Sequence, residues 1–198
     1  MTLSDAHKCD LFRMFVRRDW INMMPQAYAP LVGDRICPPV IRSAVSEGTG
    51  MNDTLTASLM LLQRRMRFDR IGIYVSTAGG AGAEARLGIY NVGLDYYPTT
   101  LILDAGTVDC TSTGSKEISI DLTLNRGWYA LVFNCNDGTI GFYYTSSHLS
   151  PLGSTRAYPY TAHGWEVAYP YGSLPDTFPA GGTRIGTRWM TLRVAELL

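Results

Sequence analysis

Apolar and polar residues alternate along much of the chain from about Thr54 onward. The clearest example is the stretch 116–124, which reads KEISIDLTL. From residue 117 onward its even positions are apolar and its odd positions are polar: Ile118, Ile120, Leu122 and Leu124 against Glu117, Ser119, Asp121 and Thr123. A strand with one face on a core and the other in water has this period of two. The pattern therefore predicts a half-buried antiparallel strand.

Other stretches extend the same prediction. Residues 127–135, GWYALVFNC, are apolar on both faces, which favours a position in the middle of a sheet. The turn at 136–138, NDG, then reverses the chain towards 139–146. Further strands are predicted at 54–62, 66–76, 85–91, 164–172 and 189–197. About eight short strands separated by Gly- and Pro-rich turns predict an all-β fold, an antiparallel β-sandwich of the jelly-roll type.

One strand changes parity along its length. In residues 66–76, Met66 and Phe68 are even, whereas Ile71, Ile73 and Val75 are odd. A β-bulge inserts one extra residue and would return all five side chains to one face. We therefore predict a bulge near Asp69-Arg70.

A glycine-rich stretch at residues 80–85, GAGAEA, matches the spelling G-x-G-x-x-A of a dinucleotide-binding turn. That motif needs a helix directly after the glycines, so that a pyrophosphate rests on the helix N-terminus. Here Leu87 and Ile89 alternate with Arg86, Gly88 and Tyr90, which indicates a strand. We therefore expect a hairpin turn without a cofactor, and a dinucleotide site is the weaker alternative.

The first 50 residues differ from the rest. Apolar residues at helical spacing predict an N-terminal helix that ends before Pro25, and its apolar stripe includes Leu11, Phe12, Phe15, Val16 and Trp20. Four prolines between Pro25 and Pro39 predict an extended arm. The stripe must pack on the β domain, on a copy of itself or on another protein. We expect residues 1–50 to serve particle attachment or oligomerisation, and residues 51–198 to form the sandwich.

The length, charge balance and hydrophobic content of the chain exclude some classes of partner. The chain has 198 residues, of which 46% are hydrophobic, and its 17 Lys+Arg balance 17 Asp+Glu. Without a basic field, a nucleic-acid partner is not expected. No uninterrupted apolar run is long enough to cross a membrane, and the N-terminus has no leader pattern. We expect no membrane insertion, and we expect the chain to be made and assembled in the cytosol.

Candidate chemistry is sparse. The cysteines Cys9, Cys37, Cys110 and Cys135 show no zinc-site spacing, and the aspartates follow no calcium-loop spacing. His7, His148 and His163 lack a Ser or Cys partner in a recognisable motif. We expect no metal, no cofactor and no enzymatic activity, although paired carboxylates for glycoside hydrolysis stay open because sequence does not show their geometry.

Aromatic residues in or next to turns are the strongest candidates for contact with a ligand or a subunit. They are Tyr96, Tyr97, Tyr143, Tyr158, Tyr160 and Trp165. Such rings offer stacking area and a polar tip. They serve either glycan or receptor binding, or contacts between subunits of an oligomer, and the second interpretation is favoured because interfaces are rich in the same residues.

Several short pieces of sequence resemble a β-rich module of tailed-bacteriophage structural proteins. They are residues 68–73 (FDRIGI), 86–90 (RLGIY), 103–106 (LDAG), 127–129 (GWY), and 172–175 (GSLP) with 178–179 (FP). The module occurs in tail-fibre, head-fibre and receptor-binding proteins, and the likeness covers about 55–194. It implies a virion protein without catalytic residues, forming oligomers that are commonly trimers.

The resemblance and the residue pattern together give the functional expectation. We expect a virion structural protein of a tailed phage or phage-like particle, joined to other virion proteins through residues 1–50 and involved in host attachment, with a host-surface glycan as a further partner. Two alternatives stay open. One is a capsid decoration, cement or head-fibre protein; the other is a stand-alone carbohydrate-binding module or glycan-cleaving enzyme.

Overall fold

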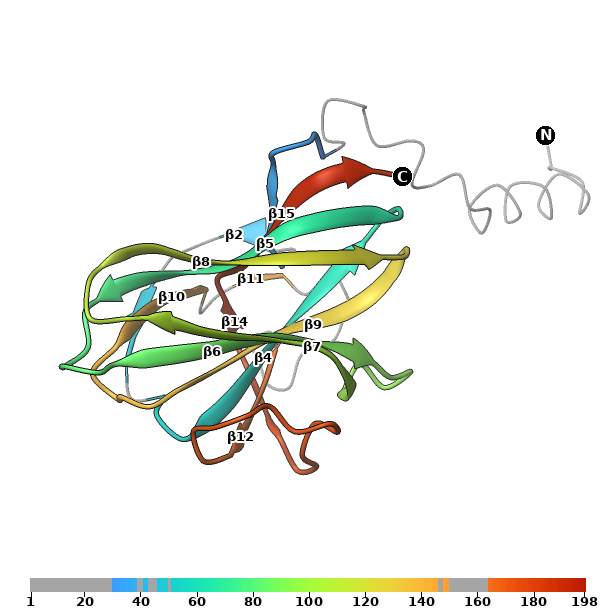
Figure 1. Ribbon diagram of the computed structural model, residues 1–198. Helices are drawn as coiled ribbons and strands as arrows, with labels where there is room; N and C mark the ends of the chain where they lie inside the picture. The colour runs from blue at the N-terminus through green and yellow to red at the C-terminus, as the bar shows by residue number, and fades with distance from the viewer. Residues whose placement is uncertain (1–29, 39–40, 43–45, 50, 146–147, 150–163) are drawn as a thin grey trace, which may run out of the picture. The chain divides into compact units, whose positions relative to one another are not determined.

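The computed structural model describes residues 30–38, 41–42, 46–49, 51–145, 148–149 and 164–198. Val32–Leu198 form one compact unit. Within the described residues all regular structure is β-strand, which confirms the all-β prediction (Figure 1). The N-terminal helix, with Leu11, Phe12, Phe15, Val16 and Trp20, lies outside the described residues.

Most strands belong to two antiparallel sheets. Sheet I has seven strands in the order β1-β15-β5-β10-β14, with β8 paired to β5 and β3 paired to β10. Its strands are β1 (Arg35–Ile36), β3 (Ser46–Gly48), β5 (Met66–Thr77), β8 (Gly114–Leu124), β10 (Gly141–Thr145), β14 (Thr187–Arg188) and β15 (Met190–Leu197). β1 comes from the segment predicted as an extended arm, and it pairs with β15 through Arg35 and Ile36.

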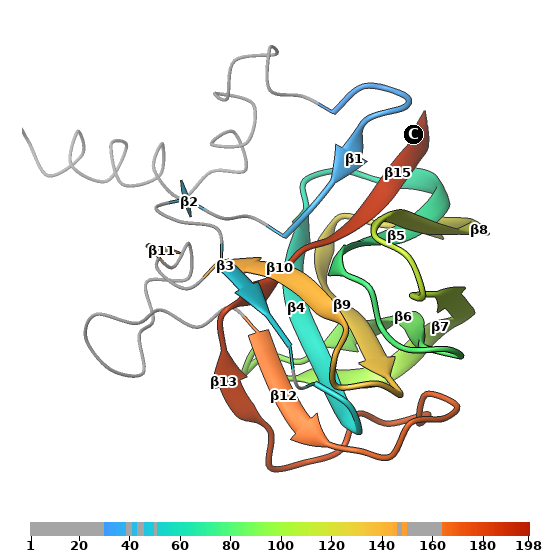
Figure 2. The ribbon, with the colours of Figure 1, turned by 90° about the vertical axis from the view of Figure 1, so that its left-hand side faces the viewer.

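Sheet II has six strands in the order β13-β12-β4-β9-β6-β7. They are β4 (Thr54–Leu62), β6 (Glu84–Val92), β7 (Pro98–Asp109), β9 (Gly127–Cys135), β12 (Gly164–Ala168) and β13 (Thr183–Ile185). β2 (Ile41–Arg42) and β11 (His148–Leu149) form a separate pair. Figure 2 shows β4, β9, β6 and β7 on one side of the sandwich and β15, β5 and β8 on the other.

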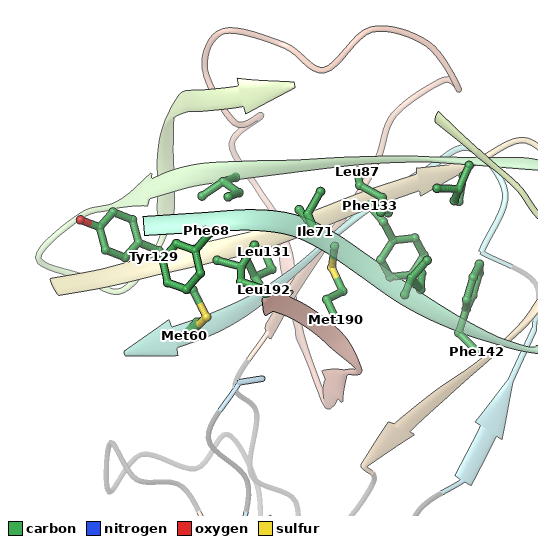
Figure 3. Close-up of a cluster of buried hydrophobic side chains, with 14 of the residues drawn as sticks. Met60, Phe68, Ile71, Leu87, Tyr129, Leu131, Phe133, Phe142, Met190 and Leu192 are labelled. Carbon is green, nitrogen blue, oxygen red and sulfur yellow. The ribbon is translucent and has the colours of Figure 1, made fainter. Parts of the chain in front are cut away.

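The main core lies between the two sheets (Figure 3). Phe68, Ile71 and Leu192 from sheet I meet Leu87 and Leu131 from sheet II, and all five are fully buried. The rings of Phe133 and Phe142, one from each sheet, have centroids 4.9 Å apart. This contact between facing layers confirms the predicted antiparallel sandwich.

The predicted bulge is present in β5. Along the β5–β15 pair, Arg193 pairs with Arg70 and the next residue, Val194, pairs with Phe68, so Asp69 is an extra residue in β5. Because of this residue, Phe68 and Ile71 both enter the core although their numbers differ in parity. The same bulge exposes Asp69 to Arg193 of β15, which donates two hydrogen bonds of 2.6 and 2.8 Å to its carboxylate.

Two predicted turns connect the expected strands, but in each case the two strands lie in different sheets. A strand, β6, does follow the glycines at 80–85, as predicted, but β5 belongs to sheet I and β6 to sheet II. The prediction of a hairpin there is therefore wrong. The turn at 136–138 likewise leads from β9 in sheet II to β10 in sheet I. Both turns cross between sheets because each following strand finds its partners in the other layer.

A second core lies on the outer face of sheet II. Residues 169–182, here called the cover segment, lay Leu174 and Phe178 over the outward residues of β4, β6 and β9. Tyr90 Oη donates to the Pro175 carbonyl (2.6 Å), and the Phe178 amide donates to the Thr99 carbonyl (2.8 Å). The cover segment explains why 127–135 is apolar on both faces: β9 is in mid-sheet, as predicted, with packing on each side.

Candidate functional site

An aromatic cluster lies where the turn between β6 and β7 meets β12 and the cover segment. Its rings are Tyr96, Tyr97, Trp128, Trp165 and Phe178. The ring centroids are 5.5 Å apart for Tyr96 and Trp128, 4.8 Å for Tyr97 and Trp165, and 5.6 Å for Tyr97 and Phe178. All three pairs are edge-to-face, the arrangement that aligns the positive edge of one ring with the negative face of another. We call these five residues the aromatic cluster.

Polar atoms of the cluster are bonded inside the protein. Tyr97 Oη donates to the Pro179 carbonyl (2.6 Å) and accepts from the Gly182 amide (2.9 Å). The Trp165 indole N–H donates to the Tyr96 carbonyl (2.9 Å). These bonds fix the rings and tie the cover segment to the β6–β7 turn. The Tyr97 hydroxyl and the Trp165 N–H therefore serve the fold first.

The turn at residues 93–97 presents two exposed hydrophobic side chains, Leu94 and Tyr96. The Gly93 amide donates to the Tyr97 carbonyl (2.9 Å), and the Tyr96 amide donates to the Gly93 carbonyl (3.1 Å). Tyr96 has φ = 62°, a conformation that bulky residues rarely adopt and that persists only where the surroundings enforce it. Leu94 is fully exposed and Tyr96 is 38% exposed. The turn thus places an aliphatic and an aromatic side chain at the surface, and the ring of Tyr96 packs against Trp128.

A groove of about 270 Å³ runs beside the cluster and is lined by Trp165, Gly182, Thr183 and Arg184. The Arg184 guanidinium lies 4.9 Å from the centroid of the Trp165 ring, as a cation–π contact requires. A wider depression of about 440 Å³ adjoins Thr183 on the other side and includes Glu166. The groove therefore offers an aromatic ring, a guanidinium and a hydroxyl, and the neighbouring depression offers a carboxylate.

This surface has the chemistry of binding. Flat rings and charged or hydroxyl groups suit contacts with a polar ligand or with another subunit. Within the described residues, no three His, Cys, Asp or Glu side chains come close enough to hold a metal ion.

Burial raises the pKa of the thiols of Cys110 to about 11 and of Cys135 to about 12, so both stay protonated near neutral pH.

The cover segment carries one further perturbed group. Tyr171 Oη lies 3.1 Å from Glu84 Oε2, and burial together with this carboxylate raises the pKa of the Tyr171 hydroxyl to about 12. The neutral hydroxyl donates to the carboxylate and joins the cover segment to the start of β6. This contact is a structural link between the segment and sheet II.

The structure brings together only some of the residues predicted from sequence. Tyr96, Tyr97 and Trp165 share the aromatic cluster. Tyr143 lies on β10 in sheet I, where its ring stacks on Tyr74 with centroids 5.4 Å apart. Tyr158 and Tyr160 lie outside the described residues.

Sequence reasoning missed Phe178, Trp128 and Leu94 as members or neighbours of this site. Phe178 occurs in a Pro-rich stretch without periodicity, so nothing in its local pattern shows that it packs on Tyr90 and Tyr97. Trp128 reads as part of a buried strand. Leu94 lies two residues before Tyr96 and Tyr97. An apolar residue between Gly93 and Asp95 in a turn is unusual, and this could have identified Leu94 as an exposed contact residue from the sequence.

The fold defines an all-β protein of two antiparallel sheets. Comparison with known proteins adds no relative: no protein-family model and no curated protein matches the chain. Among the described residues, no helix is long and apolar enough to cross a membrane.

Proposed function

We propose that the protein is a non-enzymatic virion structural protein of a tailed phage or phage-like particle. In this proposal it forms an oligomer, with three copies as the expected number. Residues 1–50 attach it to other virion proteins, and the sandwich belongs to the fibre or tail-tip apparatus that contacts the host. The proposal is based on the sequence resemblance. One structural observation supports it, because it shows contacts between the residues that carry the resemblance.

The observation is that separate pieces of the resemblance touch one another. Arg86 Nη1 donates to Asp104 Oδ2 (2.7 Å), and the Leu174 amide donates to the same oxygen (3.2 Å). Gly88 lies directly beneath Leu174 and beside the Leu103 carbonyl. Arg86 and Gly88, Leu103 and Asp104, and Leu174 come from three different pieces of the resemblance. They form one framework that fastens the cover segment to sheet II, which supports the likeness as one of fold.

We also propose that the sandwich is a jelly roll. Sheet I contains the path β1-β15-β5-β8, and sheet II the path β12-β4-β9-β6-β7. The connections from β4 to β5, β5 to β6, β7 to β8, β8 to β9 and β9 to β10 all change sheet. Repeated crossing between two antiparallel layers is the pattern of interlocked Greek keys.

The decisive experiment asks whether the protein joins particles through its N-terminal segment. A variant with Phe12, Phe15 and Trp20 changed to Ser removes the apolar stripe, and the matched control changes Lys8, Arg17 and Asp19 to Ser. We expect both proteins to fold, and only the control to be found on purified particles. Incorporation of the apolar-stripe variant at the wild-type level would contradict attachment through this segment.

Copy number separates the tail from the head. Quantitative mass spectrometry of purified particles, with imaging of the labelled subunit, should find a few copies at the tail. Hundreds of copies per head would favour the alternative, a decoration, cement or head-fibre protein. Absence from particles would overturn the virion role as a whole.

A second candidate function, a stand-alone carbohydrate-binding module, is favoured by the groove beside Trp165. Thr183 and Arg184 supply hydrogen-bonding groups next to an aromatic ring there. Binding of the purified full chain to a glycan array, lost on Trp165→Ala and kept on Tyr143→Ala, would support this candidate. Tyr143 is the matched control because it is an aromatic residue on the opposite sheet. Turnover of a surface polysaccharide would instead indicate a glycan-cleaving enzyme.

A further inference from the structure

The two sheets leave one side of the sandwich partly open. β7 is the last strand of sheet II, and β8 is bonded only to β5 in sheet I. The two strands run along the same side of the molecule in both views (Figures 1 and 2). Six aliphatic side chains on them pack against the main core but stay only partly buried: Ile102, Leu103, Ala105, Ile118, Ile120 and Leu122. We call these six residues the β7–β8 edge.

Both strands are long for edge strands. β7 has 12 residues and β8 has 11, and within the described residues each pairs along one side only, apart from a single bridge from Thr100 to Thr177. Long edges with apolar side chains are usually covered in a native protein, because unpaired N–H and C=O groups and apolar surface together invite association. The β7–β8 edge therefore requires a cover.

Neither sheet face offers a comparable row of aliphatic side chains; the outer face of sheet I carries the stacked rings of Tyr74 and Tyr143 instead. The outer face of sheet II is covered by residues 169–182. Sheet I carries ion pairs across its outer face, Arg67 with Asp121 (2.7 Å) and Arg35 with Glu117 (2.8 Å). Polar groups already satisfied within one chain gain little from a partner. The β7–β8 edge is the place where the core itself continues to the surface.

We propose that the β7–β8 edge is a subunit interface and that a second copy of this chain covers it. All six of its side chains are aliphatic, which matches an obligate interface resembling a core cut in half and offers a glycan no ring to stack on and no side-chain hydrogen bond. Each end carries one cation near one anion, Lys116 with Asp109 and Arg67 with Asp121. A copy of the same chain therefore meets no net repulsion, whereas a strongly charged partner gains nothing.

The contact is made through side chains. The β6–β7 ladder shifts register at three places, and Gly106 in β7 has φ = 95°. Such irregularities hinder direct pairing of one edge strand with another. Packing of the aliphatic row onto a neighbour's surface needs no continuous ladder, and it can build a closed ring of copies. This inference rests on the oligomeric role proposed above and names the surface that produces it.

The test is the mass of the purified full chain in solution. We compare the wild type with Ile118→Glu and with Ser119→Glu, its matched control, whose side chain points away from the core on the same strand. Light scattering over a concentration series should show an oligomer for the wild type and the control. For Ile118→Glu we expect association weakened about tenfold or more, the effect of losing 1.4 kcal/mol or more at an interface. A monomeric wild type, or a folded Ile118→Glu variant that associates normally, would overturn the proposal.

A second measurement covers the case in which Ile118→Glu does not fold. Hydrogen exchange of the wild-type protein at low and high concentration should show protection of β7 and β8 that grows with concentration. Protection that is independent of concentration would assign the cover to a segment of the same chain and would also overturn the proposal. Particle incorporation is scored separately. If the β7–β8 edge is not a subunit interface, the proposed virion role still stands. If the protein is absent from particles, the β7–β8 edge can still be a subunit interface.

Discussion

Gly88 in the middle of β6 offers a sharp test of how the cover segment is held. The glycine leaves space for Leu174, which lies above it, and for the Leu103 carbonyl beside it. An alanine Cβ at this position would lie 2.2 Å from Leu174 Cδ1 and 2.6 Å from the Leu103 carbonyl oxygen. The side chain can shift, but the carbonyl belongs to the neighbouring strand and moves only if the sheet moves. Gly88→Ala should therefore push the cover segment off sheet II.

The size of the effect follows from two opposing terms. Overpacking of a well-packed site costs about 1–3 kcal/mol. Replacing glycine by alanine also restricts the unfolded chain, which stabilises a protein by about 0.4–1 kcal/mol where the backbone permits the change. Gly172→Ala shares the second term only, because a Cβ there meets nothing within 4 Å. The two variants should thus differ by about 1–3 kcal/mol, or roughly 2–12 °C in melting temperature for a chain of this size.

Thermal unfolding followed by circular dichroism gives the comparison directly. Hydrogen exchange then locates the damage, since the amides of Leu101 and Phe178 bond to the carbonyls of Asp176 and Thr99 respectively. We expect both amides to lose protection in Gly88→Ala and to keep it in Gly172→Ala. Equal melting temperatures with unchanged protection would refute the packing argument and show that the cover segment sits more loosely on β6.

Three further predictions concern other parts of the sandwich. Phe178→Ala removes a ring packed on two tyrosines in the second core and should lower the free energy of unfolding by about 3–5 kcal/mol in urea titrations. Hydrogen bonds from Arg193 lower the pKa of Asp69, so this pair stabilises the fold above about pH 4 and ceases to do so as the pH falls through the lowered pKa. Urea unfolding of Asp69→Asn should therefore show lower stability at pH 7 and a shallower loss towards pH 2; a slope equal to that of the wild type would contradict this assignment. Cys110 and Cys135 should resist iodoacetamide in the native protein at about pH 8 and react after denaturation, as peptide mass mapping will show, because burial raises both thiol pKa values.

The alternation of apolar residues predicted most strands because each has one face on the main core. β4 and β9 have the predicted bounds, and the bulge at Asp69 follows from the parity of Phe68 and Ile71 alone. β7 was absent from the predicted strands, since its register shifts and Gly106 break the period of two. The two crossing turns were read as hairpins because a turn sequence specifies a change of direction and not the sheet that the next strand joins.

The aromatic cluster could be predicted only in part. Tyr96, Tyr97 and Trp165 stood out because they are aromatic residues beside turns. Their meeting depends on the cover segment, whose contacts join positions more than 80 residues apart, as from Tyr97 to Pro179. No local pattern encodes such contacts. The pairing of Tyr143 with Tyr74 on the other sheet was hidden for the same reason.

The position of β15 has a consequence for how the protein is made. This last strand, Met190–Leu197, lies between β1 and β5 in sheet I and brings Met190, Leu192 and Val194 into the core. Until the ribosome has released these residues, the nascent chain exposes the apolar flank of β5 and cannot close. The sandwich therefore closes only after residues 190–197 have been synthesised, and a chain truncated before Met190 should expose the apolar flank of β5 and aggregate.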